Sequence, residues 1–510
     1  MTNNRAEQPV LSLSAELQQN LANIKQLLQE PRDLIVREFR LGRSGVPCGI
    51  ICFEGLVDAN MVNRQILAPL LAYQENGDGN LGEFSPELSS FIENEVLSSF
   101  SVSRTAAPEK ALRQLLAGDT LLLMDGSAEV IVIASCGRDG RAIDEPQTES
   151  IIRGPREGFT ENIRTNTGLI RRRVKDPNLR MKTRMLGVRS QTEVTLLYIE
   201  GIAQTDLIQE AERRLNSIDV DEINSSGFIE QWISDSFLTP FPLIMNTERP
   251  DKVAGSLLQG RLAVLVDGDP FALVLPITFA SSIKSPEDYY QHWLISTLTR
   301  LLRVVAIFIA TFLPALYIAL LEYQHGMIPS KLAFSIAGSR EGVPFPAVVE
   351  AFVMEFTLEM LREAGLRLPK PIGQTIGIVG GLVIGEAAVS AGVVSPIMVI
   401  VVAITAISSF ALPSYTFAIS LRMIRFGVML AAAFFGIYGI ILVFIMINIH
   451  FVNLKSFGLP YAAPFAPTFP RDWRDLLLRA PVFLLGKRTQ MMKPKDKRKM
   501  KPGSGNHDQT

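Results

Sequence analysis

The feature that most constrains this chain is a long stretch that is almost free of charge. Between Lys370 and Arg422 the only charged side chain is Glu386. A water-facing segment would carry charges far more often, so we expect this stretch to lie in a membrane. Residues 1 to about 290 carry charges throughout and are typical of a soluble protein. The sequence therefore predicts a soluble part followed by a helical membrane part.

Four apolar segments of the second half are expected to span the membrane. They lie at about 304–321, 373–391, 396–413 and 426–449. Pro314 lies inside the first segment and is expected to kink it, because proline cannot supply a backbone N–H to the helix. Arginines stand just before this segment, which favours entry from the cytoplasm.

The distribution of charges is compatible with either four or five membrane spans. A cluster of Lys and Arg from Lys487 to Lys501 favours a cytoplasmic tail near anionic lipid. With both termini inside, the number is even, and four spans are expected. Four spans place Arg422 and Arg425 outside, whereas five spans place them inside and the tail outside.

Glycines recur at every fourth residue of the second segment, at Gly373, Gly377, Gly381 and Gly385. The residue after Gly385 is a glutamate, where a phosphate-binding loop needs lysine and then serine or threonine. On a helix this spacing places the four glycines in one groove, where backbones can approach closely. We expect this face to pack copies of the chain together.

Glu386 is an ionisable residue inside a membrane segment, which makes it a functional candidate together with Ser390 on the same segment. It would face a water-filled pore or a polar contact between subunits. The alternative is that Glu386 lies near a helix end and reaches the lipid headgroups.

A further helix is predicted at about 346–365, with Glu355, Glu359 and Glu363 along one stripe. Two interpretations compete. The helix lies in the membrane interface as an amphipathic helix, or it stands in an oligomer with the stripe facing water as rings of carboxylates that favour cations. We prefer the first slightly, because glutamates in lipid are costly.

The soluble half contains an internal duplication. The segment Gly49–Leu71 resembles Val194–Leu215, and each reads as an apolar strand, then Glu-Gly, then a helix. Asp-Gly pairs then predict a hairpin turn in each copy. We expect two copies of one α/β unit, each a small mixed sheet with helices on one face. The corresponding glutamates, Glu54 and Glu200, are interpreted as structural rather than as an acid pair.

The three cysteines follow no disulfide or zinc pattern. Cys48 and Cys52 lie on one face of a predicted buried strand, where cysteine acts as a small apolar residue.

A segment rich in Arg and Lys lies between the two copies and includes Arg171, Arg172 and Arg173. Three interpretations are open: a solvated linker, a contact with another subunit or with anionic lipid, and nucleic-acid binding. Only Phe159 is available there for base stacking, which argues against nucleic acid.

The predicted fold class is an α+β cytoplasmic domain made of two repeated α/β units, followed by an α-helical transmembrane domain. The expected parts are a polar N-terminal segment (1–30), α/β unit one (31–150), a basic linker (151–190), α/β unit two (191–290), the transmembrane domain (291–452), and a C-terminal surface helix with a basic tail (453–510). The polar N-terminus has no apolar signal core, so we expect the large N-terminal domain to be cytoplasmic.

Several long motifs carry a resemblance to a known family. They read IIRGPREGFTENIRTNTGLIRRRVKDPNLRMK, YIEGIA, GRLAVLVDGDPFALVLP and GGLVIGEAAVSAGVVSPIMVIVVAITAISSF. The chain resembles the GerA-type spore germination proteins, specifically the A subunits of germinant receptors, over about residues 30–485.

This resemblance implies a membrane subunit of the dormant endospore, in its inner membrane. It implies a homo-oligomeric ring with an ion-conducting pore, a transporter-like B subunit and a lipoprotein C subunit as partners, and release of monovalent cations at germination. A sporulation paralogue of the same architecture is an open alternative, and so is a scaffold that clusters receptors without conducting ions. We find no nucleophile–base pair, metal cluster or cofactor motif, so no enzyme activity and no cofactor are expected.

Overall fold

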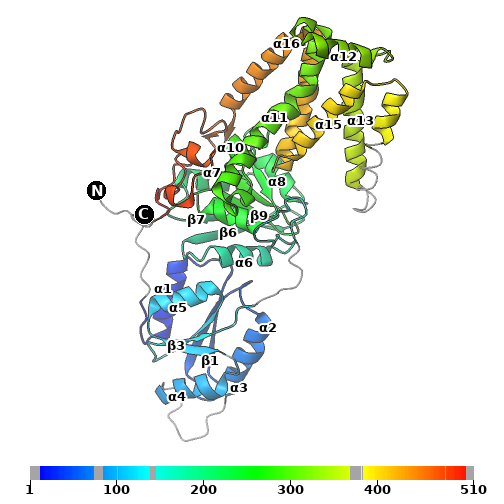
Figure 1. The fold of residues 1–510 in the computed structure, drawn as a ribbon. Coiled ribbons are helices and arrows are strands. Elements are labelled where there is room, and N and C mark those ends of the chain that lie inside the picture. The colour runs from blue at the N-terminus through cyan, green and yellow to red at the C-terminus, as the bar shows by residue number, and fades with distance from the viewer. Residues whose placement is uncertain are drawn as a thin grey trace, which may run out of the picture. The chain divides into compact units, whose positions relative to one another are not determined.

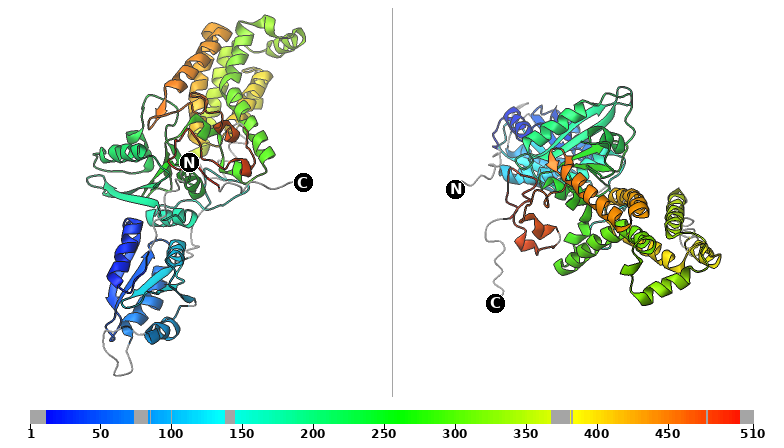
Figure 2. Two further views of the ribbon diagram at one scale, coloured as in Figure 1. Left: turned by 90° about the vertical axis from the view of Figure 1, so that its left-hand side faces the viewer. Right: turned by 90° about the horizontal axis from the view of Figure 1, so that it is seen from above.

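The computed structural model describes residues 12–73, 84, 86–99, 101–137, 145–367, 381, 383–476 and 478–500. Contacts divide the chain into two compact units. The sheet unit comprises Met1–Asp235, Ile244–Ile277 and Val482–Thr510, and the helical unit comprises Ser236–Leu243 and Thr278–Pro481. Figure 1 and Figure 2 show the ribbon of both.

The first sheet has five strands in the order β1-β2-β4-β5-β3. The strands are β1 Leu34–Arg40, β2 Pro47–Phe53, β3 Val102–Thr105, β4 Thr120–Met124 and β5 Val130–Ile133. Every neighbouring pair is antiparallel. The second sheet repeats this plan in the order β6-β7-β9-β10-β8. Its strands are β6 Leu179–Leu186, β7 Thr192–Ile199, β8 Met245–Thr247, β9 Leu262–Val266 and β10 Ala272–Leu275.

The identical strand order confirms the two repeated α/β units. The expectation of a mixed sheet is wrong, because all pairs in both sheets are antiparallel. The expectation of helices on one face is also wrong for the first sheet. Alternate residues of its strands point to opposite faces, and each face has its own apolar core.

Helices cover both faces of the first sheet. On one face lie α1 Leu17–Leu28 and α5 Pro108–Ala117. On the other lie η1 Val62–Leu67, α3 Ala68–Ala72, α4 Pro86–Phe91 and η2 Ile92–Val96, with the short α2 Ala59–Met61 leading into η1. The second sheet carries α6 Ile163–Arg173 and α9 Pro250–Leu257 on one face. Its remaining helices are α7 Thr205–Asn216 and α8 Ser226–Ile233, and α8 contacts β10.

The duplication extends to single hydrogen bonds. The backbone N of Leu17, which begins α1, donates to the Asp125 carboxylate over 3.0 Å. The backbone N of Ile163, which begins α6, donates to the Asp267 carboxylate over 3.1 Å. Each aspartate is the first residue of an Asp-Gly turn, as the sequence predicted. Helix α6 is therefore the counterpart of α1 and the first element of the second copy. Residues 163–186, expected inside a basic linker, form α6 and β6 instead.

Strand β2 is buried along nearly its whole length. Burial raises the pKa of the Cys48 thiol to about 12 and that of the Cys52 thiol to about 11, because the thiolate is poorly solvated there. Both cysteines therefore stay protonated and inert at neutral pH.

The helical unit is built from helices, most of which lie side by side (Figure 2, left). They are α11 Trp293–Glu322, α12 Ser330–Arg340, α13 Ala347–Arg367, α15 Pro396–Phe410 and α16 Tyr415–Asn453, and residues 383–390 are also helical. Short elements are α10 Phe279–Ile283, η3 Pro286–Tyr289, η4 His325–Met327, β11 Lys455–Ser456, β12 Leu459–Pro460 and η5 Asp472–Asp475; η6 Val482–Leu484 belongs to the sheet unit.

By length and composition, α11 and α16 could each cross a membrane, and α15 is a shorter apolar helix. Helix α11 contains the expected span 304–321. Helix α15 covers most of the expected span 396–413. Much of the expected span 373–391 lies outside the described residues.

Helix α16 folds back on itself at Gly436, where the backbone leaves the helical region at φ 57° and ψ −138°. The ring of Phe241 lies 6.1 Å from that of Phe417, near the start of α16, and 4.4 Å from that of Phe451, near its end. A straight helix of this length would separate its ends by about 58 Å. Helix α16 therefore consists of two arms, residues 415–435 and 437–453, and the second arm runs back toward the start of the first (Figure 1). The expected single span at 426–449 is corrected accordingly.

The arms touch closely just after the break. A Cβ placed on Gly439 would lie only 2.1 Å from the carbonyl oxygen of Ala431 in the other arm. Only glycine permits this approach, and the positive φ of Gly436 also favours glycine.

The chain leaves the helical unit at the end where α11 begins. Arg300, two turns into α11, donates a hydrogen bond to the backbone oxygen of Asp475 over 2.9 Å. Thr297 accepts one from the backbone N of Arg479 over 3.0 Å. Between α11 and residue 475 the chain therefore returns to the end of the helical unit at which α11 begins.

Candidate functional site

Three of the glutamates of α13, Glu350, Glu355 and Glu359, face other helices of the bundle. Glu355 and Arg425, on the first arm of α16, form an ion pair with a distance of 2.5 Å, and both side chains are 0% exposed. The Nε of Arg425 also donates to the carbonyl oxygen of Ala310 in α11 over 2.6 Å. Pro314 has no N–H to offer that carbonyl, which would otherwise lack its helical partner. One arginine therefore joins three helices.

Glu359 lies one turn further along α13 and pairs with two arginines. Arg362 contacts it at 2.8 Å and Arg422, on the first arm of α16, at 3.3 Å. The guanidinium of Arg362 also lies 4.9 Å from the centre of the Phe410 ring. Charged groups within an apolar bundle are stable only when paired in this way.

A second fully buried carboxylate, that of Glu350, lies in the first turn of α13. Glu350 contacts Arg340 at 2.9 Å and accepts a hydrogen bond from the backbone N of Ser395, also at 2.9 Å. The hydroxyl of Ser395 caps α15 and contacts that of Tyr317 on α11 at 3.1 Å. This network fixes the start of α15 against α13 and α11.

The stripe of Glu355 and Glu359 thus faces arginines of the same chain, an arrangement that neither sequence interpretation included. Sequence reasoning used Arg422 and Arg425 only to count spans. A signal was available, since two arginines three residues apart can match two glutamates four residues apart on a neighbouring helix. A pore role for Glu355 and Glu359 stays a prediction.

Glu386 and Ser390 lie on the exposed side of the helical stretch 383–390. Within the described residues, no hydrogen bond or ion pair is found for either side chain. A Cβ on Gly381 would meet no atom of the described part within 4 Å, and one on Gly385 would meet only Val399, at 3.7 Å. Gly373 and Gly377 lie outside the described residues. Gly381 and Gly385 therefore make no close backbone contact with the described part of the chain.

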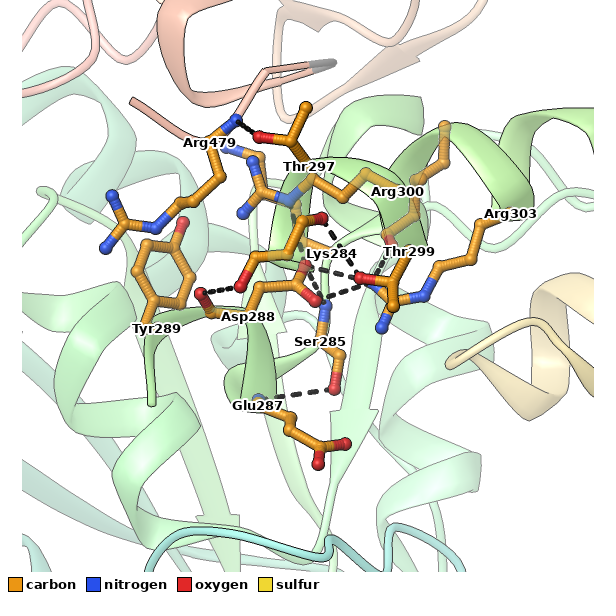
Figure 3. Close-up of polar contacts among 12 residues, drawn as sticks. Lys284, Ser285, Glu287, Asp288, Tyr289, Thr297, Thr299, Arg300, Arg303 and Arg479 are labelled. Atoms are coloured by element: carbon orange, nitrogen blue, oxygen red, sulfur yellow. Dashed lines mark hydrogen bonds and ion pairs between the residues drawn. The ribbon is translucent and has the colours of Figure 1, made fainter. Parts of the chain in front are cut away.

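A separate ionic cluster holds the base of α11 (Figure 3). Asp288 accepts hydrogen bonds from Arg300 and Arg303 over 2.8–2.9 Å. Asp475 pairs with Lys284 at 3.1 Å and with Arg300 at 3.3 Å. Burial alone would raise the pKa of the Asp475 carboxyl, but the two neighbouring cations lower it to about 2. The cluster therefore stays charged and anchors the segment after α16 to α11.

The basic block of the sheet unit is used inside the chain. Arg171 is buried, pairs with Asp33 and lies 4.1 Å from the centre of the Phe53 ring. Arg172 donates to the carbonyl oxygen of Gly137 over 2.9 Å, and Arg173 pairs with Glu157 at 2.6 Å. The first two contacts join the second copy to the first, which leaves little of the block free to bind a partner.

The repeated glutamates also have arginine partners. Glu54 pairs with Arg164, and Glu200 pairs with Arg180 at 2.7 Å. These contacts support the structural interpretation. Among the described residues, no group of three or more His, Cys, Asp or Glu is placed to hold a metal ion.

Comparison with known proteins identifies the family. The family described as Bacillus/Clostridium GerA spore germination protein matches residues 22–491. The chain belongs to this family. The resemblance seen in the sequence is therefore confirmed, and the GerA-family chain is a membrane protein of spore germination.

Full-length relatives agree with this GerA assignment. Spore germination protein GerLA of Bacillus cereus is 45% identical over 96% of this chain and 98% of its own length. Spore germination protein KA of Bacillus subtilis (strain 168) is 43% identical over 96% of this chain and 89% of its own. The crystal structure of the N-terminal domain of the A subunit of the Bacillus megaterium spore germinant receptor GerK3 is 36% identical, covers 53% of this chain and 98% of its own, and has a TM-score of 0.42.

Proposed function

We propose that this chain is the A subunit of a spore germinant receptor in the inner membrane of the endospore, with its sheet unit in the cytoplasm. Copies assemble into a ring, and nutrient binding opens an axial pore for monovalent cations. A transporter-like B subunit and a lipoprotein C subunit complete the receptor. Membership of the GerA family supports the role in germination.

The observation that carries the channel is the exposed carboxylate of Glu386. Gly385 adjoins Val399 near the start of α15. Ser395, which caps that helix, contacts Tyr317 inside the apolar stretch of α11. Glu386 therefore lies at the depth of the candidate spans, where a carboxylate facing lipid is costly. Water in a pore, or another copy, would remove that cost.

Glu386 is the best candidate to line the pore, with Ser390 one helical turn further. Glu355 and Glu359 are already neutralised by arginines, so we assign them to holding the bundle together. A ring of Glu386 carboxylates would attract cations and repel anions.

The test is K⁺ efflux from liposomes that contain the A, B and C subunits and receive nutrient. Glu386→Gln is expected to reduce the K⁺ current and its preference over Cl⁻. Glu363→Gln is the matched control, because Glu363 is exposed and pairs only with the exposed Arg367 among described residues. An equal loss of K⁺ current in both variants, or no loss in Glu386→Gln, would show that Glu386 does not line the pore.

Ring assembly is tested at Gly381. A larger side chain there meets open space in the described part of the chain. Gly381→Leu is therefore expected to disrupt contacts between copies while the subunit itself folds. Gly427→Leu is the control, since Gly427 is also exposed on a helix and has open space around it. Complexes of unchanged size on native gels for Gly381→Leu would contradict this packing face.

The alternative is a scaffold that clusters receptor partners, which the neutralised carboxylates of α13 favour. An oligomer that forms normally, yet passes no ions with any nutrient, would support the scaffold and reject the channel.

A further inference from the structure

A cavity of about 430 Å³ lies in the helical unit among α11, both arms of α16 and residues 462–466. Its size falls within the range of ligand-binding pockets. The lining is almost entirely apolar and rich in aromatic rings, including Phe312, Phe417, Phe444, Phe451 and Phe465. Such a cavity excludes water and favours an apolar occupant.

Two polar side chains of the lining donate hydrogen bonds within their own helices rather than into the cavity. Thr311 donates to the carbonyl oxygen of Ile307 over 2.8 Å, and Asn448 donates to that of Phe444 over 2.8 Å. Both are bonds within one helix. A ligand with many hydrogen-bonding groups would find few partners here, whereas an alkyl chain needs none.

The surroundings indicate where an alkyl chain would come from. The walls are α11 and α16, the two helices long and apolar enough to cross a membrane. Phe308 lines the cavity and is 51% exposed, so the cavity is open at this residue. The cavity therefore borders the side of the bundle that the hydrocarbon of the bilayer would contact.

One end of the cavity has the features of a membrane interface. The ring of Trp473 lies 5.7 Å from that of the lining residue Phe465, and Trp473 is 40% exposed. Its neighbours Arg471 and Arg474 are also exposed. Tryptophan is enriched at membrane interfaces, and arginines there attract anionic headgroups.

We propose that the cavity binds one acyl chain of an anionic phospholipid, whose headgroup lies beside Trp473 and Arg474. The chain fills the space between the two arms of α16 and α11. Bound lipid would thereby hold the two arms of α16 against α11.

The test uses the purified full chain in liposomes that contain a phosphatidylglycerol with a photoreactive acyl chain. Cross-links are expected at 304–312 and 444–452. Unlabelled phosphatidylglycerol is expected to compete better than phosphatidylcholine. Arg474→Gln is expected to reduce this preference by about five-fold, the effect of one cation near a charged membrane surface. Free fatty acid that competes as well as phosphatidylglycerol would reject the headgroup site.

A filling variant tests the cavity itself. Ala466 lines the cavity, so Ala466→Phe is expected to abolish labelling at these sites. Ala403→Phe is the matched control, because Ala403 is exposed on α15 and does not line the cavity. If Ala466→Phe does not fold, the positions of the cross-links in the unaltered chain decide whether the cavity binds the acyl chain. Cross-links spread evenly over exposed residues of α15 and α16, or disulfides between copies formed by cysteines at 308 and 444, would overturn the proposal.

Discussion

Replacing Arg425 by methionine is expected to destabilise the helical unit strongly. Removal of one partner from a buried ion pair costs about 3–5 kcal/mol, because the remaining charge stays buried and unpaired. Glu355 and Arg425 are both 0% exposed, so solvent does not screen the loss. The missing hydrogen bond to the Ala310 carbonyl adds about 1 kcal/mol, since Pro314 cannot replace it. The total is about 5 kcal/mol, which corresponds to a melting temperature lower by roughly 10–20 °C.

The assay is thermal unfolding in detergent, followed by tryptophan fluorescence. The chain has three tryptophans, and Trp232→Phe leaves Trp293 and Trp473, both in the helical unit. The signal then reports that unit alone. Arg367→Met is the control, because the ion pair of Arg367 with Glu363 is exposed and is worth at most about 1 kcal/mol.

A second substitution separates the lost charge from lost packing. Glu355→Gln in the Arg425→Met background removes the unpaired carboxylate and is expected to restore more than half of the stability. The reasoning is refuted if Arg425→Met and Arg367→Met have the same melting temperature. It is also refuted if Glu355→Gln, added to Arg425→Met, lowers the melting temperature further.

Three further predictions concern single positions. Gly439→Ala is expected to separate the arms of α16, since its Cβ would lie 2.1 Å from the Ala431 oxygen, and a pair of spin labels on the two arms would report a longer distance. Burial raises the pKa of Glu230 from 4.5 to about 7, so the folded state holds a proton that the unfolded state loses, and the stability of the sheet unit should fall as pH rises from about 4.5 to 7. Urea midpoints at pH 5 and 7 test this, and a Glu230→Gln variant with the same pH slope as the unaltered chain would contradict it. Gly168→Ala is expected to push apart the two copies of the sheet unit, because its Cβ would lie 2.5 Å from the Gly55 oxygen, which should lower the urea midpoint of that unit and leave the helical unit unchanged.

The duplication was predictable because its signals are local. Asp-Gly turns and Glu-Gly strand ends depend on neighbouring residues, and the structure keeps both. Strand pairing was harder to predict, because a strand followed by a helix is compatible with parallel or antiparallel neighbours. The antiparallel order depends on contacts between distant segments, such as β2 with β4.

The partners of charged residues were not predictable for the same reason. Arg171 was assigned to a basic linker of open role, yet its carboxylate partner, Asp33, lies 138 positions earlier. Glu355 and Arg425 are 70 positions apart. A charge pattern on one helix reveals a stripe, but it does not reveal which element covers that stripe. Hydropathy likewise located the apolar end of α16, while the fold-back depends on the conformation of one glycine.

The fold-back at Gly436 also limits how the family can change in length. Each residue inserted into one arm would rotate everything beyond it by about 100° and advance it by about 1.5 Å. Arg425 would then no longer meet Glu355, or Phe451 would no longer meet Phe241. Insertions and deletions should therefore be tolerated in the connections outside the helices and excluded from both arms, so that natural variation in this region is confined to substitutions.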